Sequence, residues 1–157
     1  MEKFVSVTNP KVIENLKLQI SNSRIIDWAT DFNKDAGISY NRLAHILDYW
    51  KNKFSWEQSE RELNSFNQFY FIDEGTKTHF LHLKSPEENA LPLLLIHGWP
   101  GSIFEFFDLI PLLINPNENN LSGSQPFDLV IPSLPNVGFS FSKKQKPMDL
   151  IEISEHF

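Results

Sequence analysis

Hydrophobic residues change their spacing along the chain, and the change divides it into two stretches. Between Asn9 and about Phe66 they recur every three or four residues, which is the spacing of an amphipathic helix. Asn9, Ser39 and Ser55 can each cap a helix N-terminus, and Pro10 suits a first helical position. The apolar stripes are narrow and flanked by charged residues. We therefore expect these helices to wrap around another layer of structure.

From Gln68 onward the spacing shortens to that of β-strands. Residues 69–72 and 78–83 are predicted strands, and Asp73-Glu74-Gly75-Thr76 between them is a predicted hairpin turn. The continuous apolar run Leu91–Ile96 is typical of a strand buried on both faces, as in a parallel sheet covered by helices.

A helix over residues 103–113 and a strand over 128–131 follow that run, and strand, helix and strand in this order predict a parallel crossover. The sequence therefore predicts an α/β fold in two parts. Residues 1–67 form a helical N-terminal region, and residues 68–157 form the beginning of an α/β domain.

Composition narrows the classes of function. A hydrophobic content of 41% is too high for a disordered chain, and a net charge of −6 argues against a nucleic-acid partner. The absence of cysteine excludes disulfides and thiolate metal sites. No apolar run approaches the roughly 20 residues of a bilayer span, and Met1–Ser23 lacks the apolar stretch of a signal peptide. We expect a cytoplasmic protein without a transmembrane segment.

The segment His97-Gly98-Trp99-Pro100-Gly101-Ser102 directly follows the apolar run. Ligands of open α/β sheets bind beyond the carboxyl ends of parallel strands, where this segment is placed. Its two glycines allow a sharp turn, and Ser102 and Glu105 have the spacing of a capping box that begins a helix. An unpaired backbone N–H at such a turn can stabilise an oxyanion. The alternative is an ordinary strand-to-helix turn with a buried Trp and no chemistry.

The residues Leu93–Ser102 resemble the oxyanion-hole segment of the microsomal-type and juvenile-hormone epoxide hydrolases. The resemblance covers nearly the whole chain in family order, through these further segments: Leu47–Trp50, Phe54–Trp56, Glu62–Phe66, Gln68–Phe69, Phe127–Pro135 and Gly138–Ser140. One departure is Asn136-Val137, which stands where the family usually has a glycine and an aromatic residue.

The resemblance implies the first strands of an α/β-hydrolase sheet and the hydration of a small hydrophobic epoxide to a vicinal diol. The reaction would pass through an alkyl-enzyme ester and needs neither cofactor nor metal. The backbone N–H of Trp99 would be an oxyanion donor, and His97, Gly98 and Pro100 would shape its turn. The Trp99–Pro100 bond would be cis, and Phe104 would line the substrate pocket.

The nucleophile that the family implies is an Asp in a Gly-x-Asp-Trp-Gly turn. Residues 1–157 contain neither Gly-x-Asp-x-Gly nor Gly-x-Ser-x-Gly, so the nucleophile, the other triad members and the lid would lie beyond Phe157. We therefore expect the chain alone to be inactive. Two alternatives stay open: part of an acyl hydrolase with a Ser nucleophile, and a stand-alone protein without catalytic activity.

Three other histidines suggest no site. His79 and His82 are three residues apart on a predicted strand, which places them on opposite faces and not around one metal ion. His156 lies at the end of the chain, where we expect fraying.

Overall fold

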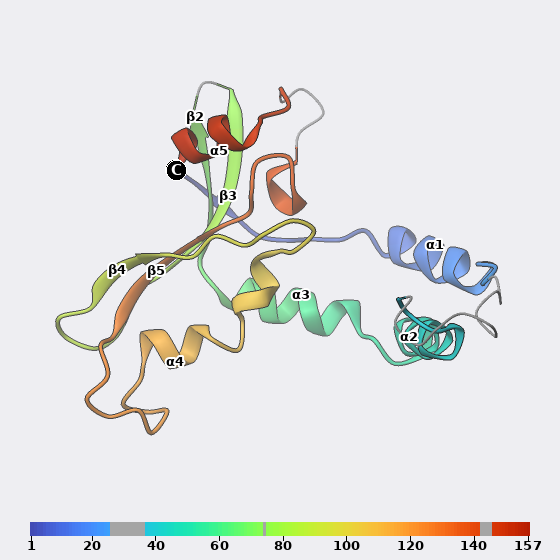
Figure 1. The fold of residues 1–157 in the computed structure, drawn as a ribbon, viewed down its shortest axis with the longest axis horizontal. Helices are drawn as coiled ribbons and strands as arrows, with labels where there is room; N and C mark the ends of the chain where they lie inside the picture. Colours follow the sequence, from blue (N-terminus) through green and yellow to red (C-terminus); the bar gives the residue numbers. More distant parts are fainter. Residues whose placement is uncertain (26–36, 74, 142–145) are drawn as a thin grey trace. The chain divides into compact units, whose positions relative to one another are not determined.

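The computed structural model describes residues 1–25, 37–73, 75–141 and 146–157 (Figure 1). These residues form two compact units. One unit is Ser6–Leu63, and the other combines Met1–Val5 with Asn64–Phe157. A domain boundary between residues 67 and 68 stays a prediction.

The first unit is helical, and its helices begin where the capping residues predict. The side-chain oxygens of Asn9, Ser39 and Ser55 accept backbone N–H groups of the following turn at 3.0, 3.3 and 3.2 Å. Each bond satisfies a donor that the helix itself leaves unpaired. The helices are α1 (Pro10–Ser21), α2 (Tyr40–Asn52) and α3 (Trp56–Ser65).

The second unit is built on one sheet with the strand order β1-β2-β3-β5-β4. Neighbours pair antiparallel except β4 and β5, which are parallel, as the predicted crossover requires. The strands are β1 (Glu2–Phe4), β2 (Gln68–Asp73), β3 (Thr76–Leu83), β4 (Leu91–Leu94) and β5 (Phe127–Pro132). The predicted α/β class, with helices followed by a sheet that contains a parallel crossover, is confirmed.

The predicted hairpin is confirmed as β2 and β3, which pair in continuous register from Gln68↔Leu81 to Asp73↔Thr76. Of the predicted turn, Glu74 lies outside the described residues. Strand β1 was not predicted, because three residues are too few to show an alternating pattern.

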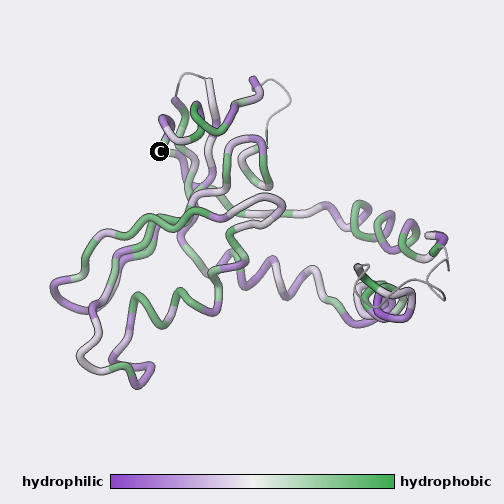
Figure 2. The backbone as a smooth tube through the Cα atoms, viewed as in Figure 1, coloured by the Kyte–Doolittle hydropathy of each residue, from purple (hydrophilic) through white to green (hydrophobic). Residues whose placement is uncertain are grey.

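The prediction that Leu91–Ile96 is a strand buried on both faces is wrong in its burial. Strand β4 covers only Leu91–Leu94 and stands last in the strand order, so it has a strand partner on one side among the described residues. Its side chains are largely exposed. Figure 2 shows the hydrophobic character of β4, of β5 and of α4 (Ile110–Ile114), the helix between them in the chain.

The prediction of one helix over residues 103–113 is also wrong. The chain forms a 3₁₀ turn, η1 (Ile103–Phe106), and then the separate short helix α4. Pro111 explains the break, since proline has no N–H to continue a helix from the preceding turn but is tolerated in a first turn. Ile103 and Ile110, from these two pieces, are buried in the core together with Leu81 and Ile131 of the sheet.

The end of the chain is ordered by contacts with the sheet. A second 3₁₀ turn, η2 (Gly138–Ser140), precedes α5 (Leu150–His156), which lies beside β2 and β3 (Figure 1). The prediction that His156 frays is wrong, because its Nε2 lies 2.8 Å from the Thr78 hydroxyl in a hydrogen bond. In the part of the chain that the structure describes, no helix is long and apolar enough to cross a membrane.

Candidate oxyanion site

The parallel pairing of β4 and β5 brings two loops to the same edge of the sheet. Residues 97–102 follow β4, and residues 133–137 follow β5. The carboxyl ends of parallel strands are where α/β sheets bind their ligands. The two loops are joined by a hydrogen bond of 3.1 Å from the Leu134 N–H to His97 Nε2.

This bond fixes the protonation of the His97 ring. A backbone N–H can only donate, so Nε2 must be the unprotonated, accepting nitrogen of a neutral imidazole. The proton is then on Nδ1, which donates to the Gly98 carbonyl oxygen at 2.8 Å. His97 is only 4% exposed, so its ring nitrogens are largely shielded from water. His97 therefore connects the β5 loop to the Gly98 carbonyl.

The Gly98 carbonyl shares its peptide group with the Trp99 N–H. This peptide is trans and planar, so its N–H points away from its carbonyl oxygen. With the carbonyl held by His97, the N–H must point away from the imidazole. Among the described residues nothing accepts a hydrogen bond from this N–H. The Trp99 N–H is thus a donor whose direction is set by His97 and which has no partner among the described residues.

The Trp99 side chain is 81% exposed. The alternative interpretation, a turn organised around a buried Trp, therefore does not describe this loop. The next peptide bond, Trp99–Pro100, is cis, as the family resemblance implied.

Gly101 is required by a close approach of other atoms. A Cβ built on it would lie 1.6 Å from Glu105 Oε1 and 2.9 Å from the Gly98 carbonyl oxygen. The Glu105 carboxylate occupies this place because it accepts the Ser102 N–H at 3.1 Å, the bond expected of a capping residue. At Gly98, by contrast, a Cβ would meet nothing within 4 Å.

Phe104 lies at the surface of the 3₁₀ turn that follows the loop and is 42% exposed. Its ring packs on Phe107 at an interplanar angle of 31°, with centroids 4.5 Å apart, and Phe107 makes a T-shaped contact with Phe66 at 5.0 Å. These contacts hold an apolar, solvent-facing surface close in sequence to the oriented amide.

A buried polar cluster beneath the β5 loop was missed from the sequence. His79 is 0% exposed, and its ring lies between the Ser133 hydroxyl and the Gln68 side-chain carbonyl, each at 3.0 Å. The Gln68 oxygen can only accept, so His79 carries its proton on Nε2 and accepts the Ser133 hydroxyl at Nδ1. The Ser140 hydroxyl accepts the His79 backbone N–H and donates to the Ser133 carbonyl, at 2.9 and 2.8 Å.

Burial lowers the pKa of His79 from 6.5 to about 4, so the ring is neutral at physiological pH. His82 lies on the other face of β3, against Phe69 at 6.4 Å. The prediction that the two histidines do not share a site agrees with this arrangement. Only pairing between distant segments reveals the role of His79, since Ser133 is 54 positions away.

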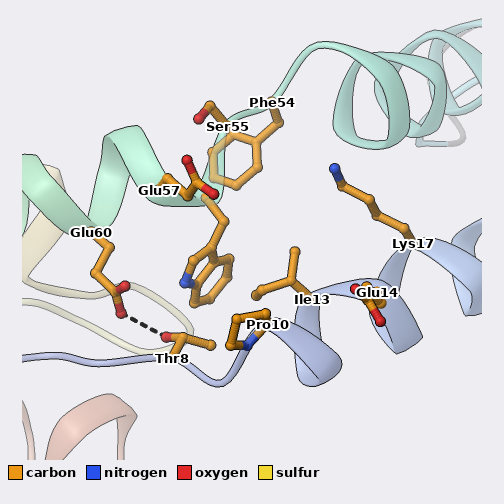
Figure 3. Close-up of a pocket in the computed structure, with 10 residues that line it drawn as sticks. Thr8, Pro10, Ile13, Glu14, Lys17, Phe54, Ser55, Glu57 and Glu60 are labelled. Atoms are coloured by element: carbon orange, nitrogen blue, oxygen red, sulfur yellow. Dashed lines mark hydrogen bonds between the residues drawn. The ribbon is translucent and has the colours of Figure 1, made fainter.

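A hollow with a volume of about 420 Å³ lies in the helical unit (Figure 3). Its carboxylate Glu60 accepts the hydroxyls of Thr8 and Ser6 at 2.7 and 2.9 Å. These bonds, above all the one from Thr8, lower the pKa of Glu60. The carboxylate is therefore engaged in tying the segment before α1 to α3, and it is not a free acid or base.

The described ranges of the chain contain no group of three or more His, Asp or Glu side chains placed to hold a metal ion. The candidate site rests on the orientation of a backbone group. Its central element is the Gly98–Trp99 peptide, held by His97.

Comparisons with known proteins identify relatives of this chain. Residues 1–106 match the family profile "Epoxide hydrolase N terminus". Epoxide hydrolase 1 of Oryctolagus cuniculus is 34% identical over an alignment of 158 positions, which covers 98% of this chain and 35% of the relative. Juvenile hormone epoxide hydrolase 1 of Ctenocephalides felis is 36% identical over 135 residues, which cover 84% of this chain and 28% of the relative.

Two solved structures match the fold over almost the whole chain. The Aspergillus niger epoxide hydrolase superposes with a TM-score of 0.80 at 32% identity. The match covers 99% of this chain and 40% of the Aspergillus niger chain. The juvenile hormone epoxide hydrolase of the silkworm Bombyx mori gives a TM-score of 0.82 at 25% identity, with coverage of 98% and 36%. The chain spans about a third of the length of the curated relatives that it matches. It belongs to the epoxide hydrolase family and corresponds to the N-terminal part of its members.

Proposed function

We propose that this chain supplies the N-terminal third of an enzyme that hydrates a small hydrophobic epoxide to a vicinal diol. Support comes from the family profile over residues 1–106 and from relatives named as epoxide hydrolases. The observation that carries the proposal is the Gly98–Trp99 peptide, whose orientation is set by His97. Residues 1–67 would form the helical N-terminal region and residues 68–157 the start of the hydrolase domain.

In this proposal the Trp99 N–H acts when the alkyl-enzyme ester is hydrolysed. Water adds to the ester carbonyl carbon, and negative charge develops on the carbonyl oxygen. A fixed N–H donor stabilises that charge without reorganising, and the loss of one such donor typically costs about 10²–10³ in rate. His97 contributes by holding the Gly98 carbonyl, so that the donor keeps its direction during the reaction.

Phe104 would supply part of the apolar wall beside the substrate. Its ring is exposed and is held at a fixed angle by Phe107. Apolar and aromatic side chains line most small-molecule pockets, with a few polar groups that orient the ligand. The carboxylate nucleophile and the base would come from residues that this chain does not contain, and no cofactor takes part. A cytoplasmic location remains a prediction.

A Ser-nucleophile acyl hydrolase is the second candidate, because a tetrahedral acyl intermediate needs the same oxyanion donor. The experiment that separates the two is to sequence the reading frame downstream of the Phe157 codon and to assay its product. We expect a Gly-x-Asp-x-Gly segment and diol formation from styrene oxide. A Gly-x-Ser-x-Gly segment with ester hydrolysis would overturn the proposal, and so would a frame that ends without any nucleophile.

A further inference from the structure

Two histidines hold two consecutive residues at the exit of β5. Ser133 is held by His79, which accepts its hydroxyl at Nδ1 and its backbone N–H at the main-chain oxygen, at 3.0 and 2.8 Å. Leu134 is held by His97 Nε2 at 3.1 Å. Ser133 and both rings are almost completely buried. The β5 exit is therefore fixed from β3 on one side and from the oxyanion loop on the other.

The His79 side of this arrangement is itself fixed. Both nitrogens of its ring are engaged, and the Ser140 hydroxyl joins the His79 backbone N–H to the Ser133 carbonyl. Since these groups are shielded from water, a broken bond is not replaced by one to solvent. A buried network that is fully satisfied specifies one arrangement of its members.

We propose that His79 is a positioning residue for the Trp99 amide. Through the Ser133 hydroxyl it fixes the place of the Leu134 N–H, and this N–H selects the tautomer of His97 that holds the Gly98 carbonyl. The relay thus runs from β3 through the β5 exit to the peptide that carries the Trp99 N–H. The catalytic meaning of this relay rests on the proposed function, whereas its structural part does not.

The test follows the tautomer of His97 and the exchange of the Leu134 amide hydrogen by NMR, with ¹⁵N-labelled histidine in the full chain. In the wild type we expect His97 protonated on Nδ1 and His79 protonated on Nε2. Ser133→Ala removes the hydroxyl that His79 accepts. We expect the Leu134 amide to exchange about tenfold faster and the His97 nitrogens to shift toward a tautomer mixture.

Ser85→Ala is the matched control. Like Ser140, Ser85 donates its hydroxyl to a backbone carbonyl, that of Ile114 at 2.6 Å, and accepts a backbone N–H, but it lies outside the relay. It should leave the His97 shifts and the Leu134 exchange as in the wild type. If Ser133→Ala fails to fold, Ser140→Ala releases the Ser133 carbonyl instead, and it should accelerate Leu134 exchange without changing the His79 tautomer.

Unchanged His97 shifts and Leu134 exchange in the folded Ser133 or Ser140 variant would overturn the proposal, as would equal changes in Ser85→Ala. Neither readout depends on turnover. A chain that shows the relay but belongs to a protein without epoxide hydrolysis would therefore contradict the proposed function and leave the relay intact.

Discussion

His97 Nε2 accepts a hydrogen bond from the backbone N–H of Leu134 at 3.1 Å, and this one contact joins the loops that follow two parallel strands. The sequence places the two residues 37 positions apart. Because the bond decides which ring nitrogen carries the proton, it also decides that His97 donates to Gly98. A buried side chain thereby orients the backbone group that would contact the substrate in the proposed reaction.

Replacing His97 with Ala should loosen both loops together. It removes a buried ring and leaves the Leu134 N–H and the Gly98 carbonyl without their partner, and each hydrogen bond lost costs about 0.5–1.5 kcal/mol. Urea denaturation would measure this loss. His82→Ala is the control, since His82 is only partly buried and lies on the opposite face of β3 from His79. Equal losses in the two variants would mean that His97 has no special structural role.

Gly101→Ala should destabilise the turn, whereas Gly98→Ala should be tolerated. The added Cβ at position 101 would overlap the Glu105 carboxylate and press on the Gly98 carbonyl, but at position 98 it meets open space. Overpacking of this kind costs about 1–3 kcal/mol.

A double-mutant cycle would identify the contact responsible. In a Glu105→Ala background the clash with the carboxylate is gone, so Gly101→Ala should cost less than it does in the wild type. Melting curves of the four proteins provide the measurement. An undiminished cost would assign the whole effect to the Gly98 carbonyl.

As the pH falls, the chain should lose stability within a pH window that is set by the pKa of His79. Its folded pKa is about 4, below the ordinary 6.5, so the unfolded chain binds more protons between these values. The contribution is fully present above pH 6.5 and declines as the pH falls, by about 3 kcal/mol at pH 4.

The wild type compared with His79→Gln isolates this effect, since the other titrating groups are common to both proteins. The difference in their free energy of unfolding should shrink from pH 7 to pH 4. Parallel pH profiles for the two proteins would show that His79 is not buried as a neutral ring.

Glu60→Gln should destabilise the helical unit by about 1 kcal/mol at neutral pH, because a charged acceptor of the Thr8 and Ser6 hydroxyls is replaced by a neutral one. The pKa of Glu60 is lowered on folding, so its contribution is present above pH 4.5 and is lost as the pH falls further.

Glu57→Gln, on the same helix, is the matched control. Glu57 is 87% exposed and lies 3.9 Å from Arg61, a pair that contributes little. Urea titrations at pH 7 and pH 3 should separate the two variants at pH 7 only. A loss as small as that of Glu57→Gln at pH 7 would contradict the assigned role of Glu60.

Features coded by neighbouring residues could be predicted from the sequence. Asn9, Ser39 and Ser55 cap helices because each side chain bonds within its own turn, and the hairpin of β2 and β3 follows from two short alternating segments. Asn136 illustrates the same rule. It stands where the family usually has glycine, and it adopts φ 63°, which asparagine tolerates better than other side chains do.

Features that depend on distant partners could not be predicted. Hydrophobicity shows that β4 is a strand, but only the pairing of the sheet decides whether its faces are covered. The position of His156 beside Thr78 and the engagement of His79 by Ser133 join segments 78 and 54 residues apart. No local pattern records such contacts, and the same holds for the contact between Leu134 and His97 on which the orientation of the Trp99 amide depends.

The most direct test removes the Trp99 N–H and leaves every side chain in place. In the enzyme encoded by the complete reading frame, the α-hydroxy analogue of tryptophan at position 99 turns the Gly98–Trp99 amide into an ester. The kcat for epoxide hydrolysis should fall by about 10²–10³ at an unchanged melting temperature. Trp99→Phe, which keeps the N–H, should retain most of its rate. A backbone ester that hydrolyses the epoxide as fast as the wild type would contradict the assignment of this amide as the oxyanion donor.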